Sequence, residues 1–174
     1  METILGADPG NKGGFVWLDL NGKIVDYLCM PMGKTNKSYE KPELDYDKLR
    51  EILLTKPYLP KFIICELPTS YGMLPASAFH YGYNFALLSR ALETYRGTKN
   101  VHYVKPQDWT KELHIGLEKE LKAKAKSKIV FEKLFSWESF GKMNKAAREG
   151  LMDACLMAEY GRRNLTRYDT LSST

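Results

Sequence analysis

The chain has 174 residues, of which 44% are hydrophobic and 27% charged, which is the composition of one globular domain and excludes a largely disordered segment. Lys and Arg number 26 against 21 Asp and Glu, and the net charge of +5 permits a polyanionic partner without requiring one. The three cysteines are widely spaced with no Cys-x-x-Cys pair, which argues against a zinc site or a disulfide framework. No apolar run is long enough for a membrane span and no signal pattern opens the chain. We therefore expect a soluble intracellular protein, in cytoplasm, nucleoid or organelle, with no membrane partner.

The first thirty residues predict three strands. Short apolar runs rich in β-forming residues span residues 3–8 and 14–20, and Pro and Gly separate them. Asn21-Gly22 is a strong signal for a two-residue hairpin turn, and residues 23–30 supply the partner strand. We expect an antiparallel meander here.

Helical and strand patterns alternate after a polar surface loop at residues 31–44. The predicted elements are a helix at 45–56, a buried strand at 61–67, a helix at 75–97, a strand at 101–104, and helices at 106–115, 118–135 and 145–163. This order predicts an α/β fold, with a mixed five-stranded sheet that is antiparallel over its first three strands, then parallel, and covered by helices on both faces. We expect one domain over residues 1–163 and a flexible tail at 164–174.

Two acidic residues end predicted strands. Asp8 follows Ile-Leu-Gly-Ala, Glu66 follows Phe-Ile-Ile-Cys, and a Pro-containing turn comes after each. If these strands are parallel neighbours, both carboxylates lie at the carboxyl edge of the sheet, where open α/β sheets form their sites. Two acids held together favour a bound cation, and the glycines after Asp8 would leave room for a phosphate backbone. A plain Asp-Pro-Gly turn is the alternative explanation of Asp8.

The last predicted helix carries a second pair of acids. Glu149 and Asp153 are four residues apart and share one face, while the opposite face has small residues suited to close packing on a sheet. An exposed pair balanced by neighbouring arginines is the alternative. With Asp8 and Glu66, the pair would give four carboxylates, which suit Mg²⁺. Two Mg²⁺ ions at one site are a recurring device for phosphodiester hydrolysis, and we expect Mn²⁺ to substitute for them.

The predicted helix at 118–135 is rich in lysine. Lys119, Lys122 and Lys126 share one face, and Lys124 and Lys128 lie on an adjacent one. Lysines of this kind anchor phosphates without reading base sequence, so we expect them to bind DNA. A solvated charged face is the alternative.

Five segments of the chain, taken in order, resemble the RuvC-type Holliday-junction resolvases of the ribonuclease H-like superfamily, and in particular their phage and plastid branch. The segments are GADPGNKGGFVWLD, ICELP, FHYGYNFALLSRALE, YVKPQDWTKELHIG and EGLMDACLMAEYGRR. The resemblance implies a ribonuclease H-like fold and a Mg²⁺-dependent endonuclease that resolves four-way DNA junctions by paired phosphodiester hydrolysis. It also implies a homodimer, whose two sites would cut opposing strands and whose contact face would be the helix at 76–96.

The same resemblance assigns roles to individual residues. The metal-binding and catalytic acids it implies are Asp8, Glu66, Glu149 and Asp153, and the catalytic lysines are Lys122 and Lys126. Bacterial members have an aromatic residue shortly after the second acid, whereas Thr69 stands near that place here. We expect Tyr71, Phe79 or Tyr81 to stack on an unpaired base instead, a packed core position being the alternative for each.

Two further functions remain open on the sequence. One is a related nuclease acting on flap or branched DNA or on RNA–DNA hybrids. The other is a non-catalytic protein that binds DNA structures. The four acids argue against the second, because a protein that only binds phosphate gains nothing from clustered negative charge.

Overall fold

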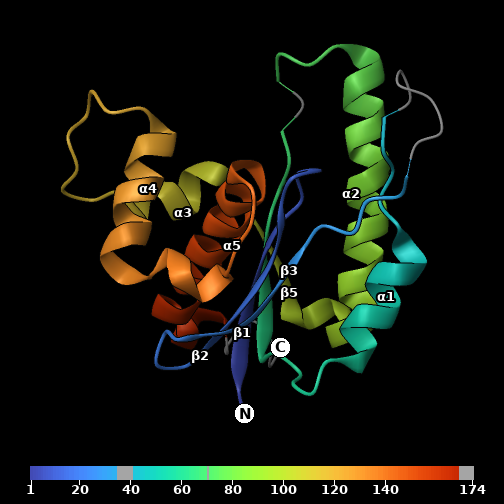
Figure 1. Cartoon of the computed structure of the whole chain (residues 1–174), viewed down its shortest axis with the longest axis horizontal. Helices are drawn as coiled ribbons and strands as arrows, with labels where there is room; N and C mark the ends of the chain where they lie inside the picture. The colour runs from blue at the N-terminus through green and yellow to red at the C-terminus, as the bar shows by residue number, and fades with distance from the viewer. Residues whose placement is uncertain (35–40, 70, 169–174) are drawn as a thin grey trace.

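The computed structural model describes residues 1–34, 41–69 and 71–168, which form a five-stranded sheet with helices on both faces (Figure 1). The strands are β1 (Thr3–Asp8), β2 (Gly14–Asp19), β3 (Ile24–Cys29), β4 (Phe62–Glu66) and β5 (Val101–Val104). Their order is β3-β2-β1-β4-β5, in which β1 to β3 are antiparallel, β4 is parallel to β1, and β5 is parallel to β4. The predicted fold class is confirmed.

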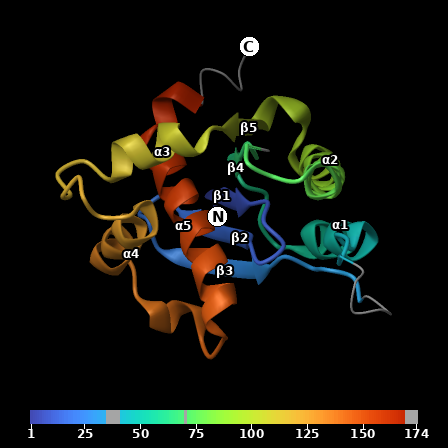
Figure 2. The same cartoon turned by 90° about the horizontal axis from the view of Figure 1, so that it is seen from above.

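The helices divide between the two faces of the sheet. They are α1 (Tyr46–Thr55), α2 (Pro75–Arg96), α3 (Pro106–Leu113), α4 (Ala123–Leu134) and α5 (Lys145–Arg163), with short 3₁₀ turns at Thr98–Asn100 and Trp137–Phe140. Helices α3, α4 and α5 lie on one side, and α1 and α2 lie on the other (Figure 2). Successive strand residues serve opposite cores: Ile4 packs toward α5 and Leu5 toward α1 and α2. Burial on both faces explains why these strands read as continuous apolar runs.

The Asn-Gly signal marks a real hairpin between β2 and β3. Gly22 has a φ of 85°, a conformation that glycine adopts without steric cost. The Asp19 carboxylate accepts hydrogen bonds from the backbone N–H groups of Asn21 and Lys23 at 2.9 and 2.8 Å. These bonds hold the turn at the end of the sheet where β1 begins.

Two predicted boundaries differ from the structure. Helix α4 begins at Ala123 rather than at 118, because Lys122 is extended with a ψ of 145°. Packed structure also continues beyond 163: residues 165–168 are helical, and Tyr168 is 2% exposed against the rings of Phe62 and His102. Burial of this aromatic ring shows that residues just after 163 pack on the sheet. The rest of the predicted tail, 169–174, and residues 35–40 of the predicted loop lie outside the described residues.

Close backbone contact places α5 on β1. A Cβ atom on Gly6 would lie 1.9 Å from the carbonyl oxygen of Ala154, and one on Gly150 would lie 1.9 Å from that of Lys12. Only residues without a side chain allow helix and strand to approach this closely. The contact fixes the N-terminal half of α5, which carries Glu149 and Asp153, against the strand that ends at Asp8.

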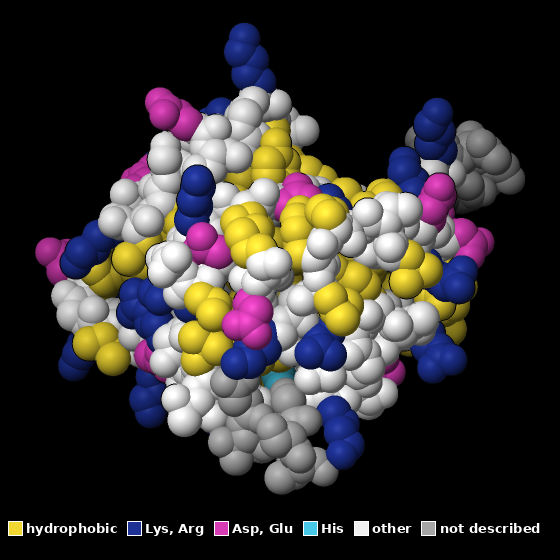
Figure 3. Space-filling model, turned by 90° about the horizontal axis from the view of Figure 1, so that it is seen from below, with side chains coloured by type: hydrophobic (Ala, Val, Ile, Leu, Met, Phe, Trp, Pro, Cys, Tyr) yellow, Lys and Arg dark blue, Asp and Glu magenta, His cyan; other side chains and the backbone are white. Residues whose placement is uncertain are grey.

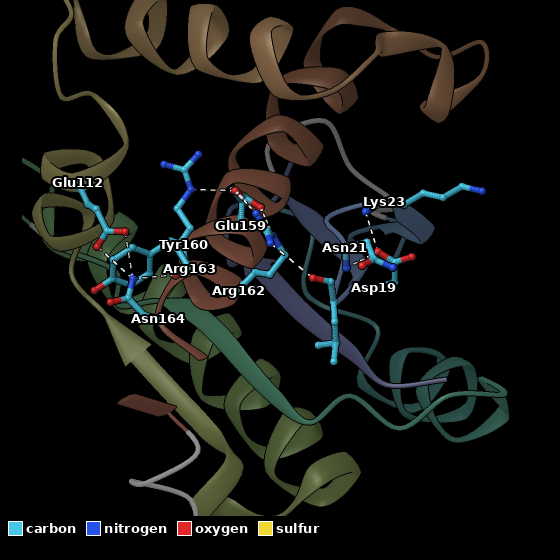
Figure 4. Close-up of polar contacts among 10 residues, drawn as sticks. Asp19, Asn21, Lys23, Glu112, Glu159, Tyr160, Arg162, Arg163 and Asn164 are labelled. Atoms are coloured by element: carbon cyan, nitrogen blue, oxygen red, sulfur yellow. Dashed lines mark hydrogen bonds and ion pairs between the residues drawn. The ribbon is translucent and has the colours of Figure 1, made fainter. Parts of the chain in front are cut away.

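The other end of α5 is held by an ion-pair cluster (Figure 4). Glu159 is buried, and its carboxylate accepts hydrogen bonds from Arg162 and Arg163 at 2.7–2.9 Å. Burial alone would raise the pKa of Glu159, but the two guanidinium groups outweigh it and hold that pKa below its usual value. Arg162 also donates to the carbonyl oxygen of Leu20 at 3.5 Å, which ties the helix to the β2–β3 hairpin.

The surface at the end where β1 begins is mixed in charge. Among the side chains that the structure describes, Lys and Arg are interspersed there with hydrophobic and acidic residues (Figure 3). None of the helices in the described ranges is both long and apolar enough to cross a membrane.

Candidate active site

Asp8 closes β1 and turns the chain. Its Oδ1 accepts a hydrogen bond from the backbone N–H of Gly10 at 3.0 Å, and the N–H of Gly13 donates to the Gly10 carbonyl at 2.7 Å. A Cβ atom on Gly13 would lie 2.8 Å from Cγ of Asp8. Gly13 and Gly14 are buried, so the space beside them is filled by the protein itself. Of the glycines after Asp8, only the partly exposed Gly10 is therefore open to the approach of a phosphate backbone.

Glu66 lies beside Asp8 at the carboxyl edge of the sheet. The pairing of Ala7 with Cys65 in the parallel β1–β4 register puts the next residue of each strand at that edge. The indole Nε1 of Trp109, a buried residue of α3, donates to Oε2 of Glu66 at 2.8 Å. Burial raises the pKa of Glu66 to about 7; the Trp109 hydrogen bond opposes the rise, and the charges of Asp8 and Asp153 add to it.

Glu149 and Asp153 extend from α5 toward the carboxyl edge of the sheet. Asp153 is 22% exposed and Glu149 is 41% exposed, so Asp153 lies deeper. Burial raises the pKa of Asp153 to about 6, with the ammonium of Lys124 opposing the rise and the charges of Asp8 and Glu149 adding to it. Burial also raises the pKa of Asp8, against the Gly10 hydrogen bond and the charge of Lys124. Asp8, Glu66 and Asp153 thus form one interacting group of carboxylates, with Glu149 at its rim.

Lys124 is the lysine of α4 that reaches these acids. Its Nζ lies 3.4 Å from Oδ2 of Asp153 and 3.7 Å from Oε2 of Glu149. Burial alone would lower the pKa of Lys124, but the surrounding carboxylates, Asp153 foremost, raise it above its usual value. The ammonium is the positive charge that the described residues supply to a group of four acids.

The other predicted lysines lie elsewhere on the segment. Nζ of Lys126 donates to the carbonyl oxygen of Lys119 at 3.2 Å, and Nζ of Lys128 lies 3.7 Å from Oε1 of Glu132. Lys122 precedes the first turn of α4. The structure therefore brings Lys124 to the carboxylates, whereas the sequence-based assignment favoured Lys122 and Lys126.

The donor set fits a hard divalent cation. Three neighbouring carboxylates have raised pKa values, which means that their negative charges are poorly compensated by the protein. Carboxylate oxygens are the ligands that Mg²⁺ prefers. Within the described ranges, no group of three or more His, Cys, Asp or Glu side chains is close enough together to hold a metal ion.

The three aromatic candidates occupy different places. Tyr71 is 98% exposed in the β4–α2 loop and Phe79 is 79% exposed on α2. Tyr81 is partly buried near the acids: burial, with the charges of Asp8 and Glu66 adding to it, raises its pKa to about 12. The exposed rings are free to contact a partner, and Tyr81 borders the carboxylates.

Trp109 is a site residue that the sequence analysis did not single out. It belongs to the segment YVKPQDWTKELHIG, and its indole fixes the orientation of the Glu66 carboxylate. Asn84 is a buried polar residue outside the carboxylate group that the sequence analysis also did not single out: it lies on α2, accepts from the backbone N–H of Leu44 at 3.0 Å, and donates to Asn11 at 3.5 Å. A polar residue at a buried helical position is the signal that could have identified it.

Comparison with known proteins supports the fold. No family model and no curated protein sequence matches the chain. The chain is similar in structure to RuvC of T. thermophilus, solved in complex with a Holliday junction substrate. The TM-score is 0.56 at 14% sequence identity, over 95% of this chain and 98% of that one. The fold of this chain is therefore the RuvC-like, ribonuclease H-like fold that the sequence predicts.

Proposed function

We propose that this protein is a Mg²⁺-dependent endonuclease that resolves four-way DNA junctions. The observation that carries the proposal is the group of carboxylates from β1, β4 and α5 at one edge of a RuvC-like sheet. A non-catalytic DNA binder has no use for buried acids whose charges raise each other's pKa values. The solved RuvC structure holds a Holliday junction, which supports branched DNA as the substrate class.

Under this proposal, the residues of the site have different roles. Asp8, Glu66 and Asp153 would hold the cations, with Glu149 at the rim. When bound, divalent cations supply Lewis-acid stabilisation of a phosphodiester and favour deprotonation of an attacking water. Trp109 holds one oxygen of Glu66 in place. Lys124 carries its ammonium at the boundary between acids and solvent, where it would bind the phosphate of the cut strand.

A homodimer would pair two such sites. Helix α2 exposes Phe79 and Tyr83, and Leu74 at its start is also exposed. Large apolar side chains gathered on one helix mark a surface suited to a partner. A two-fold dimer through this face would present two cutting sites to a nearly two-fold symmetric junction.

Cleavage of labelled synthetic DNA tests the proposal. We expect Mg²⁺-dependent, symmetric nicks across a four-way junction, little cleavage of a Y-shaped flap or an RNA–DNA hybrid, and loss of nicking in Asp8→Asn. Asp47→Asn, an exposed acid in the first turn of α1, is the matched control and should cut normally. Full activity in Asp8→Asn would overturn the carboxylate argument. Preferred cleavage of the flap or hybrid would replace the junction as substrate.

A further inference from the structure

A cavity of about 220 Å³ opens beside the carboxylates, between α4, the Trp137–Phe140 turn and the start of α5. We call it the Trp137 pocket; the lining residues that matter here are Lys124, Lys128, Trp137, Lys145, Arg148 and Glu149. Lys124 and Glu149 also belong to the candidate active site, so the pocket adjoins that site. Neither the carboxylate chemistry nor the proposed dimer uses the rest of this pocket.

The pocket carries positive charge that the protein leaves unpaired. Lys128 is paired with Glu132, but Lys145 and Arg148 form no ion pair with any residue in the described ranges. The Nε of Arg148 is buried and has no hydrogen-bond partner among those residues. A buried donor without an acceptor is unfavourable, and a phosphate oxygen is an acceptor that arginine binds well. These two cations therefore point to an anionic ligand.

Trp137 gives the pocket an aromatic wall of fixed orientation. Its ring lies 4.3 Å, centroid to centroid, from that of Phe131 in the core. Its Nε1 donates to Oε1 of Glu132 at 2.9 Å, so the one polar atom of the indole is already satisfied. What the side chain still offers is ring surface, which stacks on nucleobases whatever their identity.

The size of the pocket limits what it can hold. Sites that enclose a whole small-molecule ligand are roughly 300–1,000 Å³, so this cavity suits a fragment of a longer chain. A ligand with a phosphate, a flat ring and a continuing backbone is one nucleotide of a nucleic acid strand. We propose that the Trp137 pocket binds one unpaired nucleotide of the cleaved DNA strand, its phosphate on Lys145 and Arg148 and its base against Trp137. This assignment rests on the proposed function, because it takes the strand to run past the carboxylates.

Binding without metal tests the pocket independently of cleavage. The probe is a 5′-phosphorylated thymidine trinucleotide in EDTA, followed by tryptophan fluorescence and by anisotropy of a labelled copy. Trp17 and Trp109 are buried, so quenching should report Trp137. We expect quenching in the wild type and none in Trp137→Phe, and at least fivefold weaker binding in Lys145→Ala and Arg148→Ala. Lys133→Ala, an exposed lysine in the last turn of α4, is the control and should bind as the wild type does.

A second measurement uses a junction with one abasic residue, placed at each position next to the cut bond in turn. At one position, loss of the base should slow wild-type cleavage at least fivefold and leave Trp137→Leu unaffected. Equal trinucleotide affinity in the wild type, Lys145→Ala and Arg148→Ala would overturn the pocket assignment even if junctions are cut. Conversely, quenching and charge dependence in a protein that cuts no junction would retain the pocket and refute the proposed function.

Discussion

At the scale of single residues, the site is defined by charges that the protein does not neutralise. Glu66 and Asp153 have pKa values of about 7 and about 6, because burial and neighbouring carboxylates disfavour their ionised forms. One ammonium, that of Lys124, faces the group. Without a divalent cation, these two carboxyls of the folded protein therefore keep protons up to about pH 6–7 that they would release near pH 4 in the unfolded chain.

Stability should fall as pH rises when no metal is present. The pKa of Glu66 is higher in the folded protein than its ordinary 4.5, so the free energy of unfolding decreases between about pH 4.5 and 7 and then levels off. Glu66→Gln keeps an acceptor for Trp109 and removes the buried charge. At pH 8 in EDTA we expect it to be more stable than the wild type by about 1–2 kcal/mol, a Tm rise of roughly 2–8 °C.

Thermal unfolding in EDTA at pH 4.5 and pH 8 measures this. The two proteins should have similar Tm values at pH 4.5, and Mg²⁺ at pH 8 should stabilise the wild type more than Glu66→Gln. Glu120→Gln, an exposed acid before α4, should follow the wild type at both pH values. A Tm of Glu66→Gln below that of the wild type at pH 8 would show that the carboxylate is stabilising as an anion.

Substitution also tests which lysine takes part in cleavage under the proposed function. Lys124→Met removes the ammonium beside Asp153 and should slow single-turnover junction cleavage at saturating Mg²⁺ by about 10²-fold. Lys126→Met removes an ammonium that binds the Lys119 carbonyl, and we expect a change of less than threefold. The reverse order of effects would favour the assignment made from sequence.

Sequence reasoning predicted the positions of the acids better than it predicted the side chains that contact them. Asp8 and Glu66 could be paired because an acid at the end of an apolar run marks the end of a strand, and parallel strands share an edge. The choice among the lysines depended on where α4 starts. That start is set by the extended backbone at Lys122, which helical periodicity does not reveal. Trp109 comes to Glu66 from another element, a contact that no local pattern encodes.

At the scale of elements, the packing of α5 decides whether the site forms. The helix lies on β1 and β2, with Gly6 opposite Ala154 and Gly150 against the backbone of Lys12. Its C-terminal end is held by the Glu159 cluster (Figure 4). The helix and its boundaries were predictable from its apolar face and its small residues, whereas the glycine contacts depend on tertiary structure.

A methyl group between α5 and the β1–β2 turn should therefore be costly. Gly150→Ala would place Cβ against the Lys12 carbonyl, and we expect a loss of about 1–3 kcal/mol in unfolding free energy together with weaker Mg²⁺ binding. Gly82→Ala is the matched control, because that glycine lies within α2 and its added Cβ meets nothing within 4 Å. The control should gain about 0.5–1 kcal/mol from helix propensity. Urea unfolding and calorimetric Mg²⁺ titration measure both; equal stability of the two variants would contradict the packing argument.

At the scale of the whole molecule, the two faces of the sheet are covered by different helices and carry different groups of side chains. Helices α3, α4 and α5 cover one face, and α1 and α2 cover the other (Figure 2). Glu149, Asp153 and Lys124 belong to the first group of helices, and the exposed Phe79 and Tyr83 belong to α2. The sequence predicted this layering because alternating strands and helices require it. The position of Tyr168 was not predictable, since a lone aromatic in a polar tail gives no signal of the ring cluster that it joins.

The proposed dimer can be separated from the chemistry. Phe79→Asp places a charge on the exposed face of α2, and we expect it to shift sedimentation equilibrium from dimer to monomer at micromolar concentration. Its nicks should then become uncoupled, so that nicked junctions accumulate while the first cut persists. Leu54→Asp, at an exposed position of α1, is the control and should remain dimeric. A monomeric wild type would refute the dimer.

The order of the elements along the chain has a consequence for biosynthesis. Asp8 lies on the first strand, and Glu149 and Asp153 lie on the last long helix, so the group of carboxylates joins segments that are made far apart in time. A nascent chain that has not yet released α5 from the ribosome holds an incomplete set of acids. Contacts between distant segments also close late in folding. Under the proposed function, a growing chain would therefore be harmless to DNA, and cutting activity would arise only when the final helix docks.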